Sequence, residues 1–227
     1  MSESEGPMVS TRGEVTAEIV SIGLSAVPYA GGVLSGVANS FIQKRQNRRL
    51  NEFLKDLADD LTEVQEKINQ KFVTSDEFED LTEDIFSKAA ESRQKEKLDA
   101  FRAIFVNTIT SERANYDEAA EIVTLIDSWQ PRHIVQLKIL SDPVAADSQR
   151  GNVVGSGGGI STSLNQIFTK LLPDWDEDQI ERTWSDLYDA KIHRTSGTKT
   201  MMTDKGIHQL EGRLTEFGQK VARYLSI

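Results

Sequence analysis

The chain has 227 residues, of which 38% are hydrophobic and 27% are charged, a composition typical of a globular protein. Its formal net charge of -10 disfavours general binding to polyanions such as nucleic acids, which would require a local basic patch. Cysteine is absent, and this excludes disulfides, thiolate metal sites and cysteine nucleophiles. The length allows one large domain or two small ones, either with a buried core.

Residues 1–12 are expected to form a flexible tail. They contain Glu3 and Glu5 and no basic segment, so they do not resemble a secretory signal. Residues 13–27 are predicted to form a first helix, because apolar side chains recur at three- and four-residue steps. Pro28 ends this helix, since proline lacks the amide hydrogen that continues it.

A second helix is expected to start near Gly31 and to continue without a break to about Phe72. Its second half has the clearest periodicity in the chain, a heptad seam whose apolar residues alternate four and three positions apart. The seam consists of Leu50, Leu54, Leu57, Leu61, Val64 and Ile68. Such a seam packs against another helix, and an oligomeric coiled coil is one way to cover it.

Three further helices are predicted before residue 130. Thr74 and Glu77 have the spacing of a capping box, which marks the start of the third helix. Apolar faces then define that helix and the fourth and fifth: Phe78, Leu81, Ile85 and Ala89; Leu98, Phe101, Ile104, Phe105 and Ile109; Ala120, Val123, Ile126 and Trp129. Residues 13–130 are therefore predicted to form a bundle of long antiparallel helices.

Residues 131–227 are predicted to form a winged-helix-like domain, so that the fold as a whole is mostly α. Pro131 suits the first turn of a helix, and Asp142-Pro143 ends it. Glycines indicate a flexible loop over 145–159. Two helices follow, and the segment 192–202, with a turn at Ser196-Gly197, is expected to form a β-hairpin wing before the last helix at 216–225.

The segment 19–42 contains no charged residue and forms a candidate hairpin around Pro28. Gly32, Gly36 and Ser40 lie at four-residue steps, next to Gly31, a spacing that lets helix backbones approach closely. A basic cluster that suits anionic lipids follows at once: Lys44, Arg45, Arg48 and Arg49. Three interpretations remain open: a tightly packed hairpin inside a helical bundle, a hairpin that inserts conditionally into a membrane, and a permanent span.

The sequence offers no catalytic constellation, so we expect a protein that is not an enzyme and holds no metal or cofactor. His133, His193 and His208 belong to no metal-binding spacing. Asp174, Asp176 and Asp178 resemble the start of a calcium loop, but Gln179 and Ser185 stand where that loop requires glycine and glutamate. The glycines at 155–159 lack the lysine of a phosphate-binding loop.

The would-be recognition helix of the winged-helix-like domain is acidic. Between Asp174 and Lys191 there are seven acids, and only Arg182 and Lys191 oppose them. These acids would face phosphates in a DNA groove. Nucleic acid is therefore not an expected partner, and a role in protein interaction is preferred for this domain.

The order of three segments is similar to that in bacterial abortive-infection alpha (Abi-alpha) proteins and their relatives. The segments run from Ser87 to Ile109, from Glu121 to Pro143, and through the ending LTEFGQKVARYL from Leu214 to Leu225. The resemblance covers residues 87–227. It implies a helical region that leads into a winged-helix-like part, and a role in phage defence or growth arrest. The glycine-rich hairpin at 19–42 is outside it and instead resembles the membrane-attacking helices of small cell-death effectors.

The leading hypothesis is a non-enzymatic bacterial defence or growth-arrest effector that inserts its N-terminal hairpin into the membrane. The alternative is a soluble oligomeric adaptor for protein interaction, and a winged-helix DNA-binding regulator is the third candidate. The expected partners are a second copy of the chain or another protein, together with an anionic membrane. The expected location is the cytoplasm, with conditional association to the inner membrane.

Overall fold

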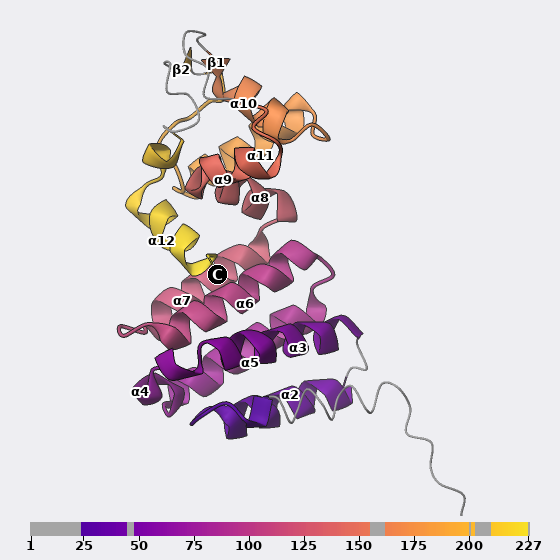
Figure 1. Ribbon diagram of the computed structural model, residues 1–227, viewed down its shortest axis with the longest axis vertical. Helices are drawn as coiled ribbons and strands as arrows, with labels where there is room; N and C mark the ends of the chain where they lie inside the picture. Colours follow the sequence, from indigo (N-terminus) through magenta and orange to yellow (C-terminus); the bar gives the residue numbers. More distant parts are fainter. Residues whose placement is uncertain (1–23, 45–47, 155–161, 200, 203–209, 227) are drawn as a thin grey trace, which may run out of the picture. The chain divides into compact units, whose positions relative to one another are not determined.

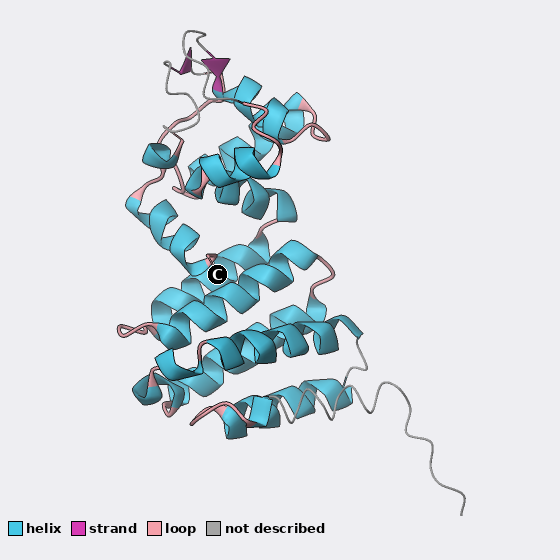
Figure 2. Ribbon diagram, in the orientation of Figure 1, coloured by secondary structure: helices cyan, strands magenta, loops and turns pink. Residues whose placement is uncertain are grey.

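The computed structural model describes residues 24–44, 48–154, 162–199, 201–202 and 210–226. These residues are mostly helical, as the sequence predicts (Figure 2). The chain divides into two compact units, unit 1 (Met1–Val123) and unit 2 (Thr124–Ile227), each with its own buried core. The boundary lies inside one helix, ahead of the predicted boundary at residue 130.

Unit 1 is built around one central helix. Its elements are α2 (Gly31–Lys44), α3 (Arg48–Glu63), η1 (Gln65–Lys67), α4 (Gln70–Val73), α5 (Asp76–Glu91) and α6 (Lys95–Thr110), and α7 (Tyr116–Ser128) crosses the boundary. Helix α5 contacts α2, α3, α4 and α6 (Figure 1). The short connection 92–94 returns the chain from α5 to α6, so these two helices pack as sequence neighbours.

The core of unit 1 contains most of the residues on the predicted helix faces, whereas Leu98 and Ala120 are only half-buried. Phe78, Leu81, Ile85 and Ala89 on α5 are all fully buried. Phenylalanine rings link the helices: the Phe78 ring centroid lies 5.8 Å from that of Phe105 on α6, and the Phe53 ring of α3 meets Phe86 at 6.1 Å, edge to face. Aromatic pairs in this range add to the stabilisation from buried area.

The prediction of an unbroken helix from Gly31 to Phe72 is wrong, because α3 ends at Glu63 and α4 begins at Gln70. Asn69 explains the break. Its backbone N–H donates to the Ile109 carbonyl at 2.7 Å, and its side-chain amide donates to the Ser111 carbonyl at 2.8 Å, both at the end of α6. The Asn69 carboxamide oxygen also accepts from the Phe72 N–H and so caps α4.

The predicted capping box at the start of α5 is also absent. Ser75, and not Thr74, is the N-cap residue, and no side-chain capping bond is made there. The Thr74 hydroxyl donates instead to the Gln70 carbonyl of the preceding turn at 3.0 Å. The helix still begins where the sequence places it, because Asp76, Glu77 and Glu79 supply negative charge to its first turn.

Unit 2 is organised around α8 (Pro131–Ser141), which contacts α9, α11, α12 and η3. The other elements are α9 (Pro143–Gln149), β1 (Thr162–Ser163), α10 (Leu164–Leu171), α11 (Glu177–Asp189), β2 (Met201–Met202), η3 (Glu211–Arg213) and α12 (Glu216–Tyr224). Pro131 begins α8, as predicted, and Pro143 begins α9. Helix α9 therefore replaces the first part of the loop predicted over 145–159, and residues 155–159 lie outside the described part.

The predicted hairpin over 192–202 is not what the described residues show. β2 pairs with β1 in an antiparallel register, with Thr162 opposite Met202, and His193 forms a separate bridge with Leu214. After the Ser196-Gly197 turn the chain contacts α10, where the Asn165 N–H donates to the Thr198 carbonyl at 2.9 Å. The two flanks of the turn therefore pair with different segments.

A buried aromatic cluster joins α11 to the segment that follows it. His193 is 1% exposed, and its ring stacks on Trp184 with a centroid distance of 3.8 Å. Its Nε2 lies 3.0 Å from the Trp184 carbonyl and donates to it in the corresponding tautomer, while Nδ1 has no hydrogen-bond partner. Burial lowers the pKa of His193 to about 4, and the nearby Arg213 guanidinium adds to this effect.

The ending Leu214 to Leu225 packs directly on this segment. Thr215 caps α12, because its hydroxyl accepts from the Gly218 N–H at 2.9 Å. Gly218 is fully packed, and a Cβ at this position would collide with the Ile192 carbonyl oxygen. The Thr-x-x-Gly spacing of the ending therefore has a structural reason.

Candidate interaction surface on helix α2

The turn before α2 is held by its own backbone hydrogen bonds. The Gly31 N–H donates to the Val27 carbonyl at 2.9 Å, and Val27 and Ala30 are buried. Tyr29 projects from this turn with 64% of its surface exposed, and its φ of 63° lies in the left-handed region. The result is a turn without charged residues, from which the Tyr29 side chain projects.

Gly31 has a different role from the other small residues of the predicted set. A Cβ on Gly31 would collide with the Ser25 carbonyl oxygen, so this glycine permits the turn to close on α2. Its contribution is therefore to folding, whereas the three residues at four-residue steps lie on another face of the helix.

That other face of α2 is exposed. Gly32, Gly36 and Ser40 are all exposed, and a Cβ at either glycine would have no described neighbour within 4 Å. The opposite face, with Leu34 and Ala38 fully buried, packs within unit 1, mainly on α5. The predicted tight packing of the glycine face is thus not made by any part of the chain that the structure describes.

Only part of the basic cluster after α2 lies within the described residues. Arg48 begins α3, is highly exposed, and approaches Glu52 at 3.5 Å. Arg49 is also exposed. Lys44 is the last residue of α2, and Arg45 lies outside the described residues.

The leucines of the heptad seam face the core of unit 1. Leu50, Leu54, Leu57 and Leu61 are fully buried in unit 1, where α3 contacts α5 and α6. Val64 and Ile68 lie beyond the end of α3 and are half-buried. The seam leucines therefore cover unit 1's own core, and a coiled coil with a second chain would need them to be released.

Arg102 lies at the polar edge between α3 and α6, and no sequence pattern predicts this role. Its Nε lies 2.6 Å from the Asp60 carboxylate, and its Nη1 lies 3.0 Å from Asp56. Burial raises the pKa of Asp60, and the Arg102 charge opposes that effect. A helix-face count could place these residues on the polar sides of their helices but could not pair them.

The acids of α11 are partly used inside unit 2. Asp186 accepts from His133 Nε2 at 2.9 Å, and the Asn165 amide donates to Glu177 at 2.6 Å. Asp176 caps the helix together with Gln179. Asp178 and Asp189 remain exposed on the outer surface of α11, where the exposed Arg182 lies 3.9 Å from Asp178.

The described residues show no cluster of side chains that could hold a metal ion. His133 uses both ring nitrogens, since Nδ1 accepts from the Gln130 N–H and Nε2 donates to Asp186. His208 lies outside the described part.

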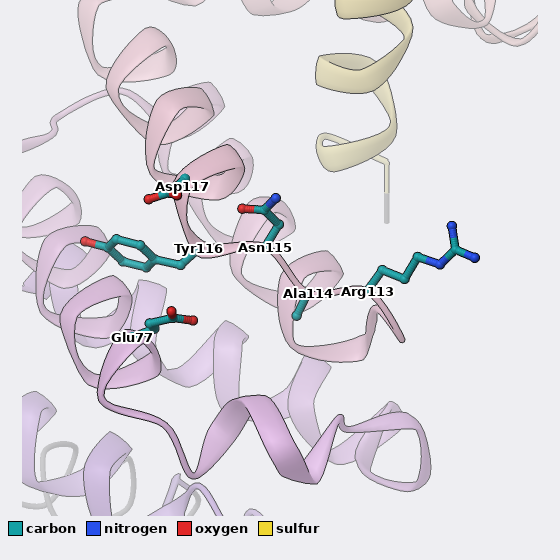
Figure 3. A pocket seen from close by; sticks show the side chains of 6 residues that line it. All are labelled: Glu77, Arg113, Ala114, Asn115, Tyr116 and Asp117. Carbon is teal, nitrogen blue, oxygen red and sulfur yellow. The ribbon is translucent and has the colours of Figure 1, made fainter.

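One shallow hollow of about 380 Å³ lies in unit 1, beside the start of α7. Figure 3 shows its lining side chains, which come from the first turn of α5 and from the chain that enters α7: Glu77, Arg113, Ala114, Asn115, Tyr116 and Asp117. The Asn115 carboxamide oxygen accepts from the Glu118 N–H and so caps α7. This polar rim offers no nucleophile with an adjacent base.

No helix within the described ranges is both long and apolar enough to cross a membrane. The chain matches no protein-family model, and comparisons with curated proteins and with solved structures find no significant relative. Within the described residues, the exposed face of α2 is a surface whose small residues have no packing role in unit 1.

Proposed function

We propose that this chain is a non-enzymatic interaction protein that associates with a second copy of itself through the exposed face of α2. The supporting observation is the pair of exposed glycines, Gly32 and Gly36, on a helix whose other face is buried. The bacterial defence or growth-arrest setting rests on the resemblance of residues 87–227 to Abi-alpha proteins.

Gly32 and Gly36 are unfavourable residues for an exposed helix. A glycine in a helix interior destabilises it by about 0.5–1 kcal/mol relative to alanine. At Gly31 the described structure requires glycine, but at Gly36 the space beside the backbone is open. Small residues at four-residue steps allow two helix backbones to approach, and a second α2 supplies such a backbone.

Sedimentation equilibrium of the full chain tests this proposal. We expect association at tens of micromolar, and Gly36→Leu should weaken it about tenfold or more, because leucine blocks close approach. Leucine is also the better helix former, so misfolding would not account for the loss. Gly197→Leu is the matched control, since Gly197 is exposed and open but lies in unit 2. Equal association of all three proteins would contradict the proposal.

A second candidate is the membrane-inserting effector, which the uncharged stretch 19–42 and the following basic cluster favour. Helix α2 has 14 residues and is about 21 Å long, shorter than the ~30 Å hydrocarbon core. Insertion therefore requires the turn at Pro28 to reorganise and α2 to leave α5. Dye release from anionic liposomes at neutral and mildly acidic pH tests this version, and Gly36→Leu should abolish the release.

We further propose that unit 2 is a winged-helix-like domain used for protein contacts. Support comes from the order α8, β1, α10, α11 and β2, and from the His193–Leu214 bridge. A winged-helix DNA regulator is less favoured, because Asp178 and Asp189 are exposed on the outer surface of α11. Salt-dependent and sequence-selective DNA binding by the full chain would reverse this preference.

A further inference from the structure

We propose that α2 and α3 are exchanged between two copies of this chain in a domain-swapped dimer, and that residues 64–69 are the hinge of this exchange. In the exchanged form, α3, the hinge and α4 make one continuous helix. The partner is a second copy, but the contact differs from association through the exposed face of α2, because here the buried contacts of unit 1 are remade between copies.

The hinge has a helix-forming sequence, although the structure breaks the helix there. Residues 64–69 contain neither glycine nor proline, and Gln65, Glu66 and Lys67 are good helix formers. These three residues instead form the short 3-10 turn η1. Such turns between helical segments often mark hinges. The local preference for helix is therefore overruled by contacts made elsewhere in unit 1.

Two residues of the hinge adopt an extended conformation. Ile68 has a φ of -63° and a ψ of 127°, and Asn69 has a φ of -73° and a ψ of 94°. Both φ values already suit a helix, so rotation of ψ to about -42° at these positions would join η1 to α4. Hinges commonly concentrate a large dihedral change in a few residues of this kind.

Asn69 fastens the hinge to α6 in the closed form that the structure describes. Its N–H donates to the Ile109 carbonyl at 2.7 Å, and its side-chain amide donates to the Ser111 carbonyl at 2.8 Å. In a continuous helix the Asn69 N–H would donate to the Gln65 carbonyl instead. Exchange therefore replaces the bonds with α6 by helical hydrogen bonds, and Asn69 sets much of the balance between the two forms.

The contacts of α2 and α3 suit an exchange. Helix α2 packs mainly on α5, and α3 packs on α5 and α6, both of which follow the hinge in the sequence. The buried leucines of α3 would enter the same surfaces on the second copy, while Phe72 of α4 stays buried on its own α5. Exchange of an identical element is a low-cost route to dimers, because native contacts are kept.

The end of the heptad seam gains a partner in the exchanged form. Val64 and Ile68 are only half-buried in the described structure. The two continuous helices of a swapped dimer meet near their hinges, where symmetry places the same residues of both copies together. Their Val64 and Ile68 side chains would then cover one another. The exchanged form thus uses the part of the seam that the closed form leaves incomplete.

Cross-linking of mixed chains detects the exchange. The chain has no cysteine, and the side chains of Asp56 on α3 and Arg102 on α6 meet at 3.0 Å. One preparation carries Asp56→Cys and the other Arg102→Cys, and the two are refolded together from urea and treated with a short bismaleimide. Exchange places the two cysteines side by side in different chains, so a covalent heterodimer is expected.

Asn69→Ala in both chains should raise the yield of this heterodimer about threefold or more, because it removes the side-chain bond to Ser111 and favours helix. Gln65→Ala, at an exposed position of η1, is the control and should change the yield much less. Absence of the covalent heterodimer with Asn69→Ala overturns the proposal.

Gln70→Pro separates exchange from folding. Gln70 is the first residue of α4 and follows the extended Asn69, so proline suits the closed form. Inside a continuous helix, proline would remove a hydrogen bond and clash with the preceding turn. Its heterodimer yield should be about tenfold or more below that of Gln70→Ala, while both variants keep the helical circular dichroism of the parent. Equal yields overturn the proposal.

Gly36→Leu distinguishes the exchange from the association through α2. This substitution lies outside the hinge, so it should leave the heterodimer yield unchanged while it weakens the association through the exposed glycine face. Gln70→Pro should have the opposite pattern in the same two measurements. Loss of the heterodimer in Gly36→Leu would assign the cross-link to the α2 face and overturn the exchange.

Discussion

His193 occupies a position in which protonation is costly. Its ring is buried against Trp184, one nitrogen is used by a carbonyl, and the other has no partner. A charged imidazole there would lose its hydration, and this burial lowers the pKa to about 4, although the backbone groups of Trp184 and Thr195 favour the charged form. The neutral ring is thus part of the folded state.

The stability of unit 2 should therefore fall in acid. An unfolded histidine titrates near pH 6.5, so the unfolded state binds the proton first as the pH is lowered from 6.5 toward 4. Over this interval the free energy of unfolding should drop by about 3 kcal/mol. Urea unfolding followed at several pH values measures it. His193→Gln should lose this dependence and His208→Gln should keep it, and a parent protein equally stable at pH 7 and pH 4.5 would contradict the argument.

Gly218 gives a second test at a single position. Because a Cβ would meet the Ile192 carbonyl, Gly218→Ala must displace α12 or the segment at 192, and it should destabilise unit 2 by about 2 kcal/mol or more. Gly212→Ala, where the added carbon meets open space, should change the stability by less than about 0.5 kcal/mol. Similar unfolding midpoints for the two variants would show that the close approach is not rigid.

The helices differ in what determines their ends. Apolar faces such as Phe78 to Ala89 on α5 follow from periodicity alone, because a residue's own helix decides which face it occupies. The break between α3 and α4 at 64–69 does not follow from periodicity. It depends on the hydrogen bond from the Asn69 side chain to the end of α6, which is distant in the sequence. The same holds for β2, which pairs with β1 and not across the nearby turn.

Asn69→Ala should show how much the break between α3 and α4 depends on one side chain. It removes the cap of α4 and leaves the Ser111 carbonyl without that donor, so a loss of about 1–2 kcal/mol is expected. Gln70→Ala, at an exposed neighbouring position, is the control. Thermal unfolding of both variants measures the difference, and equal midpoints would assign the break to the backbone bond with Ile109.

The candidate surface was predicted only in part. The four-residue spacing of Gly32, Gly36 and Ser40 could be recognised in the sequence, and so could the lack of charge around it. The exposure of this face could not be predicted, because periodicity shows which residues share a helix face but not whether another part of the chain covers that face. Tyr29 carries no sequence signal beyond following Pro28, since its left-handed backbone depends on how the turn closes on α2.

The two units have separate cores, and the tryptophans report on only one of them. Trp129, Trp175 and Trp184 all lie in unit 2. We expect urea unfolding to give different midpoints by tryptophan fluorescence and by far-ultraviolet circular dichroism, because the second signal includes the helices of unit 1. Acid should move the fluorescence midpoint more. Coincident transitions at every pH would instead show that both units unfold as one.

The central position of α5 also bears on how the chain is made. All of the partners of α5 (α2, α3, α4 and α6) are complete by Thr110, and unit 1 itself is complete by Val123, while most of unit 2 is still being translated. At synthesis rates of roughly 5–20 residues per second, unit 1 precedes the end of unit 2 by several seconds. Unit 2 has the opposite order, because α8 emerges first and its partner α12 last. The side of α8 that contacts α12 therefore stays uncovered until α12 has been synthesised, even though α9 and α11 are already present.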